Sequence, residues 1–363
     1  MGKRIVLILS LTVFAVMSVS AVGLGTLKGV MKPDMIEVFG NEIYVVEGST
    51  ISIYSLKGLS LIRKFGNPGE GPGELKQAFT YANRVIPAHD RIFVDSVDKV
   101  LYFSKEGKLI SEKRKPFAIG QALPIGKNFV VKRQKFDSDK KIVFITLGIF
   151  DSNMEEIKEL FRQKFIQQGF AMDLIQDFLR FQVFDDKLFI EESPNGFVVE
   201  VFDSNGEKLY QIKKEYNEIE VTTADREAAE TEIREDPMIK PQINAIGGWA
   251  AAKKIFTFNY PDKFPAIQDI AVSNNKIYIR TSLIQDNKNE YFIMDLKGKI
   301  LEKLYMPRLK KPDFKARLLG VKLNTIYNDR LYFIQENNSE EWELHMIEMN
   351  MFRTGKPTLT DSM

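Results

Sequence analysis

Residues 91–110 read RIFVDSVDKVLYFSKEGKLI, and this stretch contains a structural unit that the chain repeats. It begins with a short strand that has an aromatic residue at its centre, Ile92-Phe93-Val94. A second strand, Val100-Leu101-Tyr102-Phe103, leads into the turn Ser104-Lys105-Glu106-Gly107, and a third strand starts at Leu109. β-branched and aromatic residues favour strands, and glycine supplies the positive φ that tight turns need. The stretch therefore predicts antiparallel strands joined by short turns.

The aromatic-centred strand recurs six times. Its copies are Ile43-Tyr44-Val45, Ile92-Phe93-Val94, Asn128-Phe129-Val130, Leu188-Phe189-Ile190, Ile277-Tyr278-Ile279 and Leu331-Tyr332-Phe333. A strand–turn–strand segment follows each copy, and an apolar strand such as residues 35–39 precedes it. A solenoid would show a shorter and more uniform period, whereas here the aromatics lie roughly 40 to 90 residues apart. The sequence therefore predicts an all-β fold, a six-bladed β-propeller of four-stranded antiparallel blades with short helical insertions.

The strand–turn–strand pattern around residues 92–109 resembles the NHL-type six-bladed propeller family, and in particular exported bacterial propellers. The resemblance covers nearly the whole chain after the N-terminal segment and is weakest in the third repeat. It implies the fold and leaves the function open, because such propellers include binding modules, adaptors and unrelated enzymes. The loop FGNPGEGPGEL, residues 65–75, is similar to a connection between blades. It lacks a phosphate-loop pattern, and Glu70 and Glu74 would repel an anion.

The N-terminus has the three parts of a secretory signal peptide: a basic start with Lys3 and Arg4, an apolar run and small residues. We expect a signal peptide over residues 1–21, cleaved after Ala21, with Gly23 as a second choice. The protein would then be secreted or periplasmic. The alternative is an uncleaved N-terminal membrane anchor, because the apolar run just reaches the roughly 18 residues that span a bilayer.

Charge and cysteine content exclude several functions. The chain has 51 basic and 49 acidic residues, and Lys3 and Arg4 belong to the signal, so the remainder is neutral. A neutral chain has little of the phosphate neutralisation on which nucleic-acid binding depends, so we expect no nucleic-acid partner. The basic runs at residues 132–135 and 308–311 are interpreted as solvated loops. There is no cysteine, and hence no disulfide, lipidation site or thiolate metal ligand.

The propeller is predicted to span residues 22–352, followed by a flexible C-terminal tail over 353–363. Residues 27–30 are expected to complete the sixth blade and so close the ring. Two helical insertions are predicted. Apolar residues at three- and four-residue spacing indicate an amphipathic helix over about 162–179, and a capped, helix-forming run indicates a helical insert over about 223–256.

The helical insert at 223–256 has two interpretations. It either covers apolar surface on one face of the disc, or forms a lid or a docking surface for a partner, because irregular insertions on a rigid repeat scaffold often determine specificity. Trp249, Tyr260 and Phe264 are the candidate binding residues, since exposed aromatics bind both sugars and protein partners. We therefore expect a non-catalytic binding propeller whose ligand is a protein, peptide or glycan in the cell envelope.

The alternative function is that of a calcium-dependent hydrolase, of lactonase or esterase type, with its site at the central channel. Calcium needs only carboxylate and carbonyl oxygens, and the candidate ligands are Asp95, Asp98, Glu191 and Asp269. These residues match no lactonase motif, and aspartate at a strand end often caps a turn. The chain has two histidines, His89 in a turn and His345 in a strand, which is too few for a typical zinc site. We expect no cofactor and no metal, with calcium as the open possibility.

Overall fold

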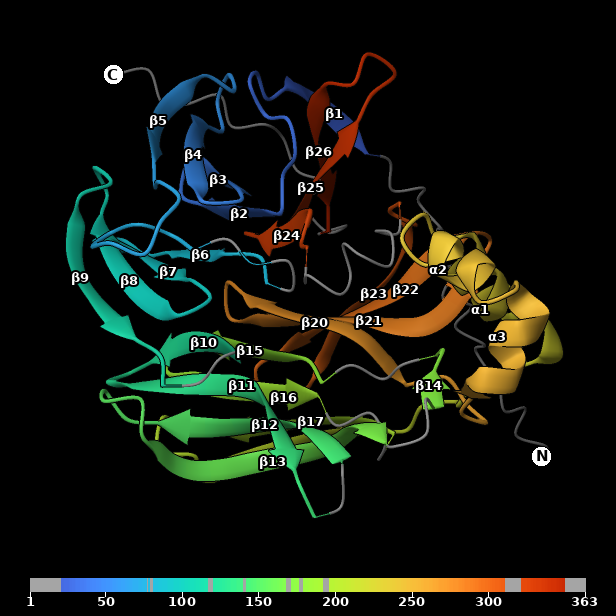
Figure 1. Cartoon of the computed structure of the whole chain (residues 1–363). Helices are drawn as coiled ribbons and strands as arrows, with labels where there is room; N and C mark the ends of the chain where they lie inside the picture. The colour runs from blue at the N-terminus through green and yellow to red at the C-terminus, as the bar shows by residue number, and fades with distance from the viewer. Residues whose placement is uncertain are drawn as a thin grey trace, which may run out of the picture.

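The computed structural model describes residues 21–76, 78, 81–116, 120–139, 142–167, 171–175, 179–191, 196–310 and 321–349. Six antiparallel four-stranded sheets surround a central axis, as Figure 1 shows. The prediction of a six-bladed β-propeller is therefore confirmed. The signal-peptide prediction for residues 1–20 and the predicted tail over 353–363 lie outside the described residues.

Five blades are formed by consecutive strands, and the first strand of each lies nearest the axis. Blade one contains β2 (Met35–Phe39), β3 (Glu42–Glu47), β4 (Thr50–Ser55) and β5 (Leu61–Phe65). Blade two contains β6 (Arg84–Pro87), β7 (Arg91–Asp95), β8 (Lys99–Ser104) and β9 (Leu109–Arg114). Blade three contains β10 (Gly120–Ile125), β11 (Asn128–Asp137), β12 (Ile142–Phe150) and β13 (Glu156–Gln167).

The second half of the ring follows the same plan. Blade four contains β15 (Phe181–Phe184), β16 (Lys187–Glu191), β17 (Phe197–Phe202) and β18 (Lys208–Lys214). Blade five contains β20 (Ile267–Ser273), β21 (Lys276–Gln285), β22 (Lys288–Asp295) and β23 (Ile300–Pro307). Blade six combines β24 (Asn324–Tyr327), β25 (Arg330–Glu336) and β26 (Trp342–Glu348) with β1 (Val22–Thr26) from the other end of the chain.

The repeated aromatic strand is the second strand of every blade, and its aromatic residue is buried in all six. In five blades the ring packs toward the following blade, as Tyr44 does among Val85 and Ile92 of blade two. Blade three differs, because Phe129 is the second residue of its strand rather than the third. A shift of one residue reverses the face on which a side chain lies. Phe129 accordingly packs back against Phe93 of blade two, with ring centroids 6.3 Å apart.

The turns of the repeat form as their composition predicts. Asn274 and Asn275, which join β20 to β21, have φ of 51° and 56°, and two Asp residues adopt the same conformation before β16. The turn between the third and fourth strands is held by a side chain. In blade four, Asp203 Oδ1 accepts hydrogen bonds of 2.9 Å from the N–H groups of Asn205 and Glu207. Asp151 and Asp295 make the same two contacts in blades three and five, so these aspartates are turn-forming residues.

Every outer strand is interrupted by a β-bulge near its start, and the residue left out of the ladder is an exposed aliphatic one in each blade. The six residues are Leu24, Ile62, Ile110, Ile157, Leu209 and Leu301. A bulge bends and twists the strand that carries it. None of the six blades therefore offers a straight outer edge for pairing with a second molecule.

The ring is closed by β1, which pairs antiparallel with β26 as the outer strand of blade six. Residues 27–30 were expected to form this strand, but β1 lies just upstream, at Val22–Thr26. The expected residues have a different role in the same closure. Leu27 and Val30, 1% and 4% exposed, fill the core between blades six and one. The Leu27 N–H donates to the carbonyl of Trp342 at 2.9 Å.

The closure predicts a contrast between two neighbouring leucines. Leu27→Ala should lower the free energy of unfolding by about 2–5 kcal/mol, because it leaves a cavity in the core between the first and last blades. Leu24→Ala, a matched control in the same segment, should change it by less than about 0.5 kcal/mol, because Leu24 is an exposed bulge residue. Urea denaturation followed by tryptophan fluorescence measures both. Equal effects of the two substitutions would contradict closure through Leu27.

The helix predicted over about 162–179 is wrong. The segment contains the end of β13 and the short strand β14 (Ala171–Asp173). The pairing of β13 with β12 shifts register three times, between Val143 and Phe144, Leu147 and Gly148, and Ile149 and Phe150. Only the first of these shifts lies within the predicted helix, where Phe165 is left out of the ladder, and each shift interrupts the two-residue alternation by which a strand is recognised.

Three helices occupy the connection from blade four to blade five, where the helical insert is predicted. They are α1 (Thr223–Glu235), α2 (Lys240–Ala245) and α3 (Trp249–Ile255), and β19 (Thr257–Asn259) follows them. α1 begins with a capping box in which the Thr222 hydroxyl accepts from the Asp225 N–H at 3.2 Å and Asp225 accepts from the Thr222 N–H at 2.9 Å. Strand β19 pairs in parallel with β14, so the two insertions join each other.

Candidate functional site

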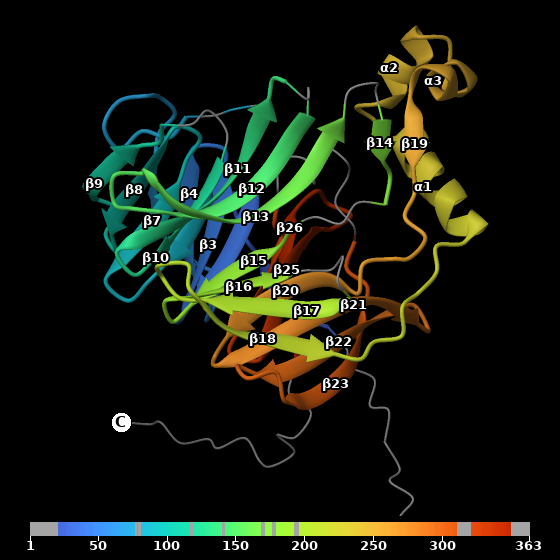
Figure 2. The same cartoon turned by 90° about the horizontal axis from the view of Figure 1, so that it is seen from below.

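Both insertions rise from the same face of the disc, which we call the cap face. Figure 2 shows α1–α3, β14 and β19 standing above the blades, beside the upper ends of β11–β13, which also extend beyond the disc. We call the first group the cap and the extended part of blade three the wing. The tight turns between the first and second strands of each blade lie on the opposite face, where the described residues form no insertion. The candidate functional site is therefore on the cap face.

The cap has a small hydrophobic core of its own. Ile233, Ile243 and Ala252, one from each helix, are buried together, and Leu174, Ile239, Trp249 and Phe256 pack against them. None of the six described clusters between the blades includes a cap residue. Among the described residues, the helices thus bury apolar side chains against one another rather than in a core between two blades. They form a separate body that is held on the ring by two connections.

Two of the three predicted binding residues meet inside the cap. The Trp249 indole N–H donates to Glu230 at 3.1 Å, and the Tyr260 hydroxyl donates to the other oxygen of the same carboxylate at 2.9 Å. Burial opposes the charge of Glu230, but these hydrogen bonds and Lys253 outweigh it and lower its pKa. Burial and the Glu230 carboxylate raise the pKa of Tyr260 to about 12. Trp249 therefore braces α1 against α3, and Tyr260 braces α1 against the chain that follows β19.

Trp249 also stacks on Phe258 at 5.1 Å between centroids, with the rings 12° from parallel. Phe264, the third predicted residue, lies apart from this group on the approach to blade five. It is half-buried, and its N–H donates to the Ile219 carbonyl at 2.8 Å. A ligand-binding role of the three aromatics stays a prediction, and the structure adds a bracing role for two of them.

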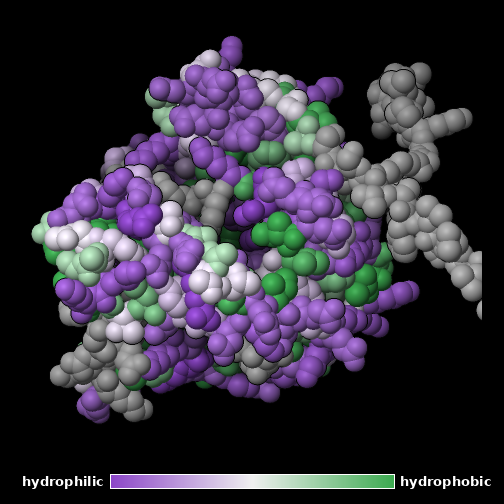
Figure 3. Space-filling model, turned by 90° about the vertical axis from the view of Figure 1, so that its right-hand side faces the viewer, coloured by the Kyte–Doolittle hydropathy of each residue, from purple (hydrophilic) through white to green (hydrophobic). Residues whose placement is uncertain are grey.

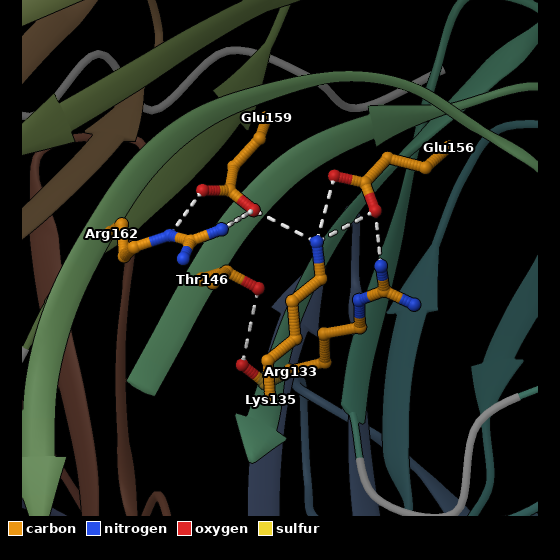
Figure 4. Close-up of polar contacts among 6 residues, drawn as sticks. All are labelled: Arg133, Lys135, Thr146, Glu156, Glu159 and Arg162. Atoms are coloured by element: carbon orange, nitrogen blue, oxygen red, sulfur yellow. Dashed lines mark hydrogen bonds and ion pairs between the residues drawn. The ribbon is translucent and has the colours of Figure 1, made fainter. Parts of the chain in front are cut away.

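One side of the wing carries a network of charges, shown in Figure 4. Lys135 of β11 reaches two carboxylates of β13, Glu156 at 2.9 Å and Glu159 at 2.8 Å. Arg162 binds Glu159 at 2.6 Å, and Arg133 contacts Glu156. Hydrogen bonds from Arg162 and Lys135 lower the pKa of Glu159 to about 2 despite its partial burial. The basic run at 132–135 is therefore not a solvated loop but part of β11, and strand alternation separates its cations onto two faces.

The other side of the wing faces blade four and combines apolar residues with Lys132 and Gln134 of β11. Phe136 is 67% exposed there and pairs with Val143 on β12. Nearer the disc, Ile145 and Phe161 pack against the core between blades three and four.

Three cations lie near the cap face in blades two, three and four: Arg84 and Arg180 at inner strands, and Lys132 on the second strand of blade three. Arg84 is the first residue of β6, Lys132 lies in β11, and Arg180 directly precedes β15. The Lys132 ammonium donates to the carbonyl of Leu179 at 2.9 Å, and Arg180 lies 3.5 Å from the carboxylate of Glu191. Burial, together with Arg84 and Arg180, lowers the pKa of Lys132 to about 8, and Glu191 opposes this only in part. We call these three cations the mouth cluster.

The sequence did not single out the mouth cluster. Its cations belong to three different blades, 48 residues or more apart in neighbouring pairs, and no short motif links them. The only available signal was the position of Lys132 along its strand. Lys132 lies two residues after Val130, so it occupies the face of β11 on which an apolar residue would be expected. That position points a charged side chain into the space between two blades.

The carboxylates proposed as calcium ligands do not converge. Asp95 is buried against Lys115 at 2.9 Å and accepts from the Ala122 N–H at 3.1 Å, while burial raises its pKa. Glu191 faces Arg180, and Asp269 is exposed in blade five. Asp98 lies in the turn after β7. Across the described ranges, no group of three His, Asp or Glu side chains is arranged to hold a metal ion.

The glycine-rich loop at residues 65–75 is the connection from blade one to blade two, as predicted. Leu75 is buried between these blades, and the Lys99 ammonium donates to the Gly71 carbonyl at 2.6 Å. Gly66 has φ of 87°, and a Cβ there would lie 2.5 Å from the Ser49 carbonyl oxygen. The loop is thus fixed by packing, and Glu74 accepts the Gly71 N–H that a phosphate would need.

Comparisons with known proteins give no family for this chain: no family model and no curated protein matches it. Among solved structures, BamB from Moraxella catarrhalis is 10% identical, with 86% of this chain and 71% of that chain covered and a TM-score of 0.31. The Pan2 WD40 domain of Neurospora crassa is 7% identical over 92% and 95% of the two chains, with a TM-score of 0.39. Kluyveromyces lactis Hsv2 is 11% identical over 87% and 98%, with a TM-score of 0.36.

Likeness at this level carries no argument about function. The six-bladed architecture rests on the strand pairing of this chain itself. The resemblance to NHL-type propellers stays a prediction. Of the helices in the described ranges, none is both long and apolar enough to cross a membrane.

The lowered pKa of Lys132 predicts a pH dependence of stability. Folded Lys132 loses its proton near pH 8, whereas a lysine in the unfolded chain keeps it to about pH 10.5. Between these values the unfolded state binds more protons, so the free energy of unfolding should rise with pH, by up to about 3 kcal/mol. Arg84, Arg180 and Glu191 are the charged groups that set this shift.

This prediction is checked by urea denaturation at pH 7, 8.5 and 10. Lys132→Met should remove the rise in the free energy of unfolding with pH. The variant should therefore exceed the original protein in stability most at pH 7 and least at pH 10. Lys127→Met, an exposed lysine of the same blade on the opposite face, should leave the rise intact. If the free energy of unfolding changed with pH in the same way for Lys132→Met and the original protein, the pKa of Lys132 would not be lowered in the folded state.

Proposed function

We propose that this protein is an exported, non-catalytic binding propeller that holds a protein or peptide partner on its cap face. The carrying observation is the independence of the cap. It has its own core, and the six blades pack and close without it. An insertion that the ring does not need for its own burial is a typical place for a binding surface.

The shape of this side supports the proposal. In Figure 3 the lobe that contains the helices stands apart from the blades with a hollow between them, and apolar side chains reach the surface beside the hollow. The wing adds Phe136, and the cap adds Ile246 and Ile255, which are 41% and 47% exposed. Exposed aliphatic side chains suit contact with a protein.

The same residues favour a protein over a glycan. Sugar rings bind on open aromatic faces, but Trp249 is stacked on Phe258 and tied to Glu230, and Tyr260 donates to the same carboxylate. Export rests on the sequence of the N-terminal segment and on the absence of cysteine. An NHL-type exported bacterial propeller remains our proposal for its class.

Export predicts a defined N-terminus. Protein recovered from the periplasm or medium of a bacterial expression host should begin at Val22, because cleavage after Ala21 leaves β1 complete. Cleavage after Gly23 would remove the first pair of β1, Val22 with Met346. Intact-mass spectrometry measures the terminus. Full-length protein in the membrane fraction would instead support the N-terminal anchor.

Partner binding on the cap face is tested with two surface variants of the exported protein. After crosslinking in cells, the double variant Ile246→Glu/Ile255→Glu should lose at least about tenfold of the partner that the original protein retains, because charge opposes apolar docking. The control, Ile110→Glu, changes an aliphatic residue that is 58% exposed on the outer edge of blade two. Equal retention by both variants, or loss only with the control, would overturn the assignment. Retention on a carbohydrate resin alone would favour a glycan.

A further inference from the structure

A pocket of about 520 Å³ lies where the chain leaves blade four for the cap, and we call it the root pocket. Its lining includes Phe197, the first residue of β17, and Lys214, the last residue of β18. These two residues pair across the hairpin. Because the turn from β15 to β16 lies on the opposite face, β17 begins and β18 ends on the cap face. The root pocket is therefore on the cap face.

The two connections of the cap meet beside the root pocket. Glu218 belongs to the first connection and lines the pocket, and it forms an ion pair with Lys263 of the second connection. The Phe264 N–H of the second connection donates to the Ile219 carbonyl of the first at 2.8 Å. A ligand in the pocket would therefore contact the ring and the base of the cap together.

One wall of the root pocket is aromatic and is held by the ring. Phe197 is 2% exposed and belongs to the core between blades four and five. The half-buried Tyr216 packs on it with ring centroids 5.9 Å apart. Phe292 of blade five meets Phe197 edge-on at 5.7 Å. These contacts fix Tyr216, so a ligand group that packs on this wall binds preorganised apolar surface.

The charges of the lining favour an anionic group. Glu218 is paired with Lys263. Among the described residues, the side chains of Lys213, Lys214 and Glu215 have no ion-pair or hydrogen-bond partner. Two cations thus stand against one carboxylate in the part of the lining that is available to a ligand, and such a surface attracts negative charge.

Lys214 is the better placed of the two lysines. Paired residues of antiparallel strands lie on the same face of the sheet, so Lys214 shares a face with Phe197, whereas Lys213 lies on the other face with Val198. Lys214 is also half-buried, and Lys213 is exposed. Partial burial strengthens an ion pair, because less water screens it.

We propose that the root pocket binds the C-terminal residue of the protein partner, with an aromatic side chain against Phe197 and Tyr216 and the carboxylate on the Lys214 ammonium. Lys214 and Tyr216 are two residues apart, so both groups of the ligand must be bound close together. Only a C-terminal residue carries its side chain and a backbone carboxylate on one Cα. The inference rests on the proposed function, because it names the part of the partner that the cap face receives.

The root pocket is tested by ligand-detected NMR of the purified exported protein with small probes. N-acetylphenylalanine carries both groups, N-acetylphenylalaninamide lacks the carboxylate, and N-acetylalanine lacks the ring. The first should bind saturably with a Kd on the order of 1 mM, which is the strength expected of so small a ligand. The other two should bind at least about fivefold more weakly, because each loses one of the two contacts.

Variants of Lys214 separate the ion pair from general stickiness. Lys214→Met should weaken the binding of N-acetylphenylalanine to the level of its amide and leave the binding of the amide unchanged. Lys214→Arg should retain the preference for the acid. Lys127→Met, which removes an exposed lysine on the opposite face, is the matched control and should bind as the original protein does. Circular dichroism establishes that all variants are folded.

Three results would overturn the proposal: no saturation with N-acetylphenylalanine at about 10 mM, equal binding of the acid and its amide, or unchanged binding of the acid by Lys214→Met. A fourth probe, the amide of N-acetyl-phenylalanyl-glutamate, has only a side-chain carboxylate. If it bound more tightly than N-acetylphenylalanine, the assignment to a C-terminal residue would be wrong.

This proposal and the proposed function fail separately. If N-acetylphenylalanine binds through Lys214 but Ile246→Glu/Ile255→Glu retains the crosslinked partner fully, the root pocket stands and the cap assignment fails. If no probe binds but the double variant loses the partner, the cap-face binding function stands without the root pocket.

Discussion

Contact between neighbouring blades is the interaction on which the rest of this structure depends. A single four-stranded sheet has two faces, and a blade buries both only when it has a neighbour on each side. Tyr44, Phe93 and their counterparts fill these contacts, so the aromatic of each second strand is buried by a different blade. The ring must therefore close. Strand β1 achieves this by pairing with β26, while Leu27 fills the core between the last blade and the first.

A closed ring provides a rigid base, so elements attached to it can stay folded with only a small hydrophobic core of their own. The cap illustrates this, because its core contains only three buried residues among those described, while the chain on either side of it continues into blades. The wing is the continuation of three strands whose lower halves are buried in the disc. The cap and the wing thus lie on one face, whereas the described connections on the opposite face are short turns.

Much of the fold followed from local pattern. Asparagine and aspartate pairs predicted the turns, and Asn274–Asn275 form one with both φ positive. The helical run after Thr222 predicted α1, which depends on local capping. The end of β13 was mistaken for a helix, and a bulge at Phe165 disturbs the alternation of this strand there. Lys132 was mistaken for a loop residue because its burial is produced by blade four, which lies far along the chain.

The sequence by itself determined the six repeats, the four strands of each blade and the use of the two ends to close the ring, because these depend on residues that are neighbours along the chain. Only the tertiary structure decided which aromatics brace the cap, as Trp249 and Tyr260 do through Glu230, and which cations meet at the channel mouth. The reason is physical. Turn and strand preferences act over a few residues, whereas burial and electrostatic repulsion depend on side chains that only closure of the ring brings together.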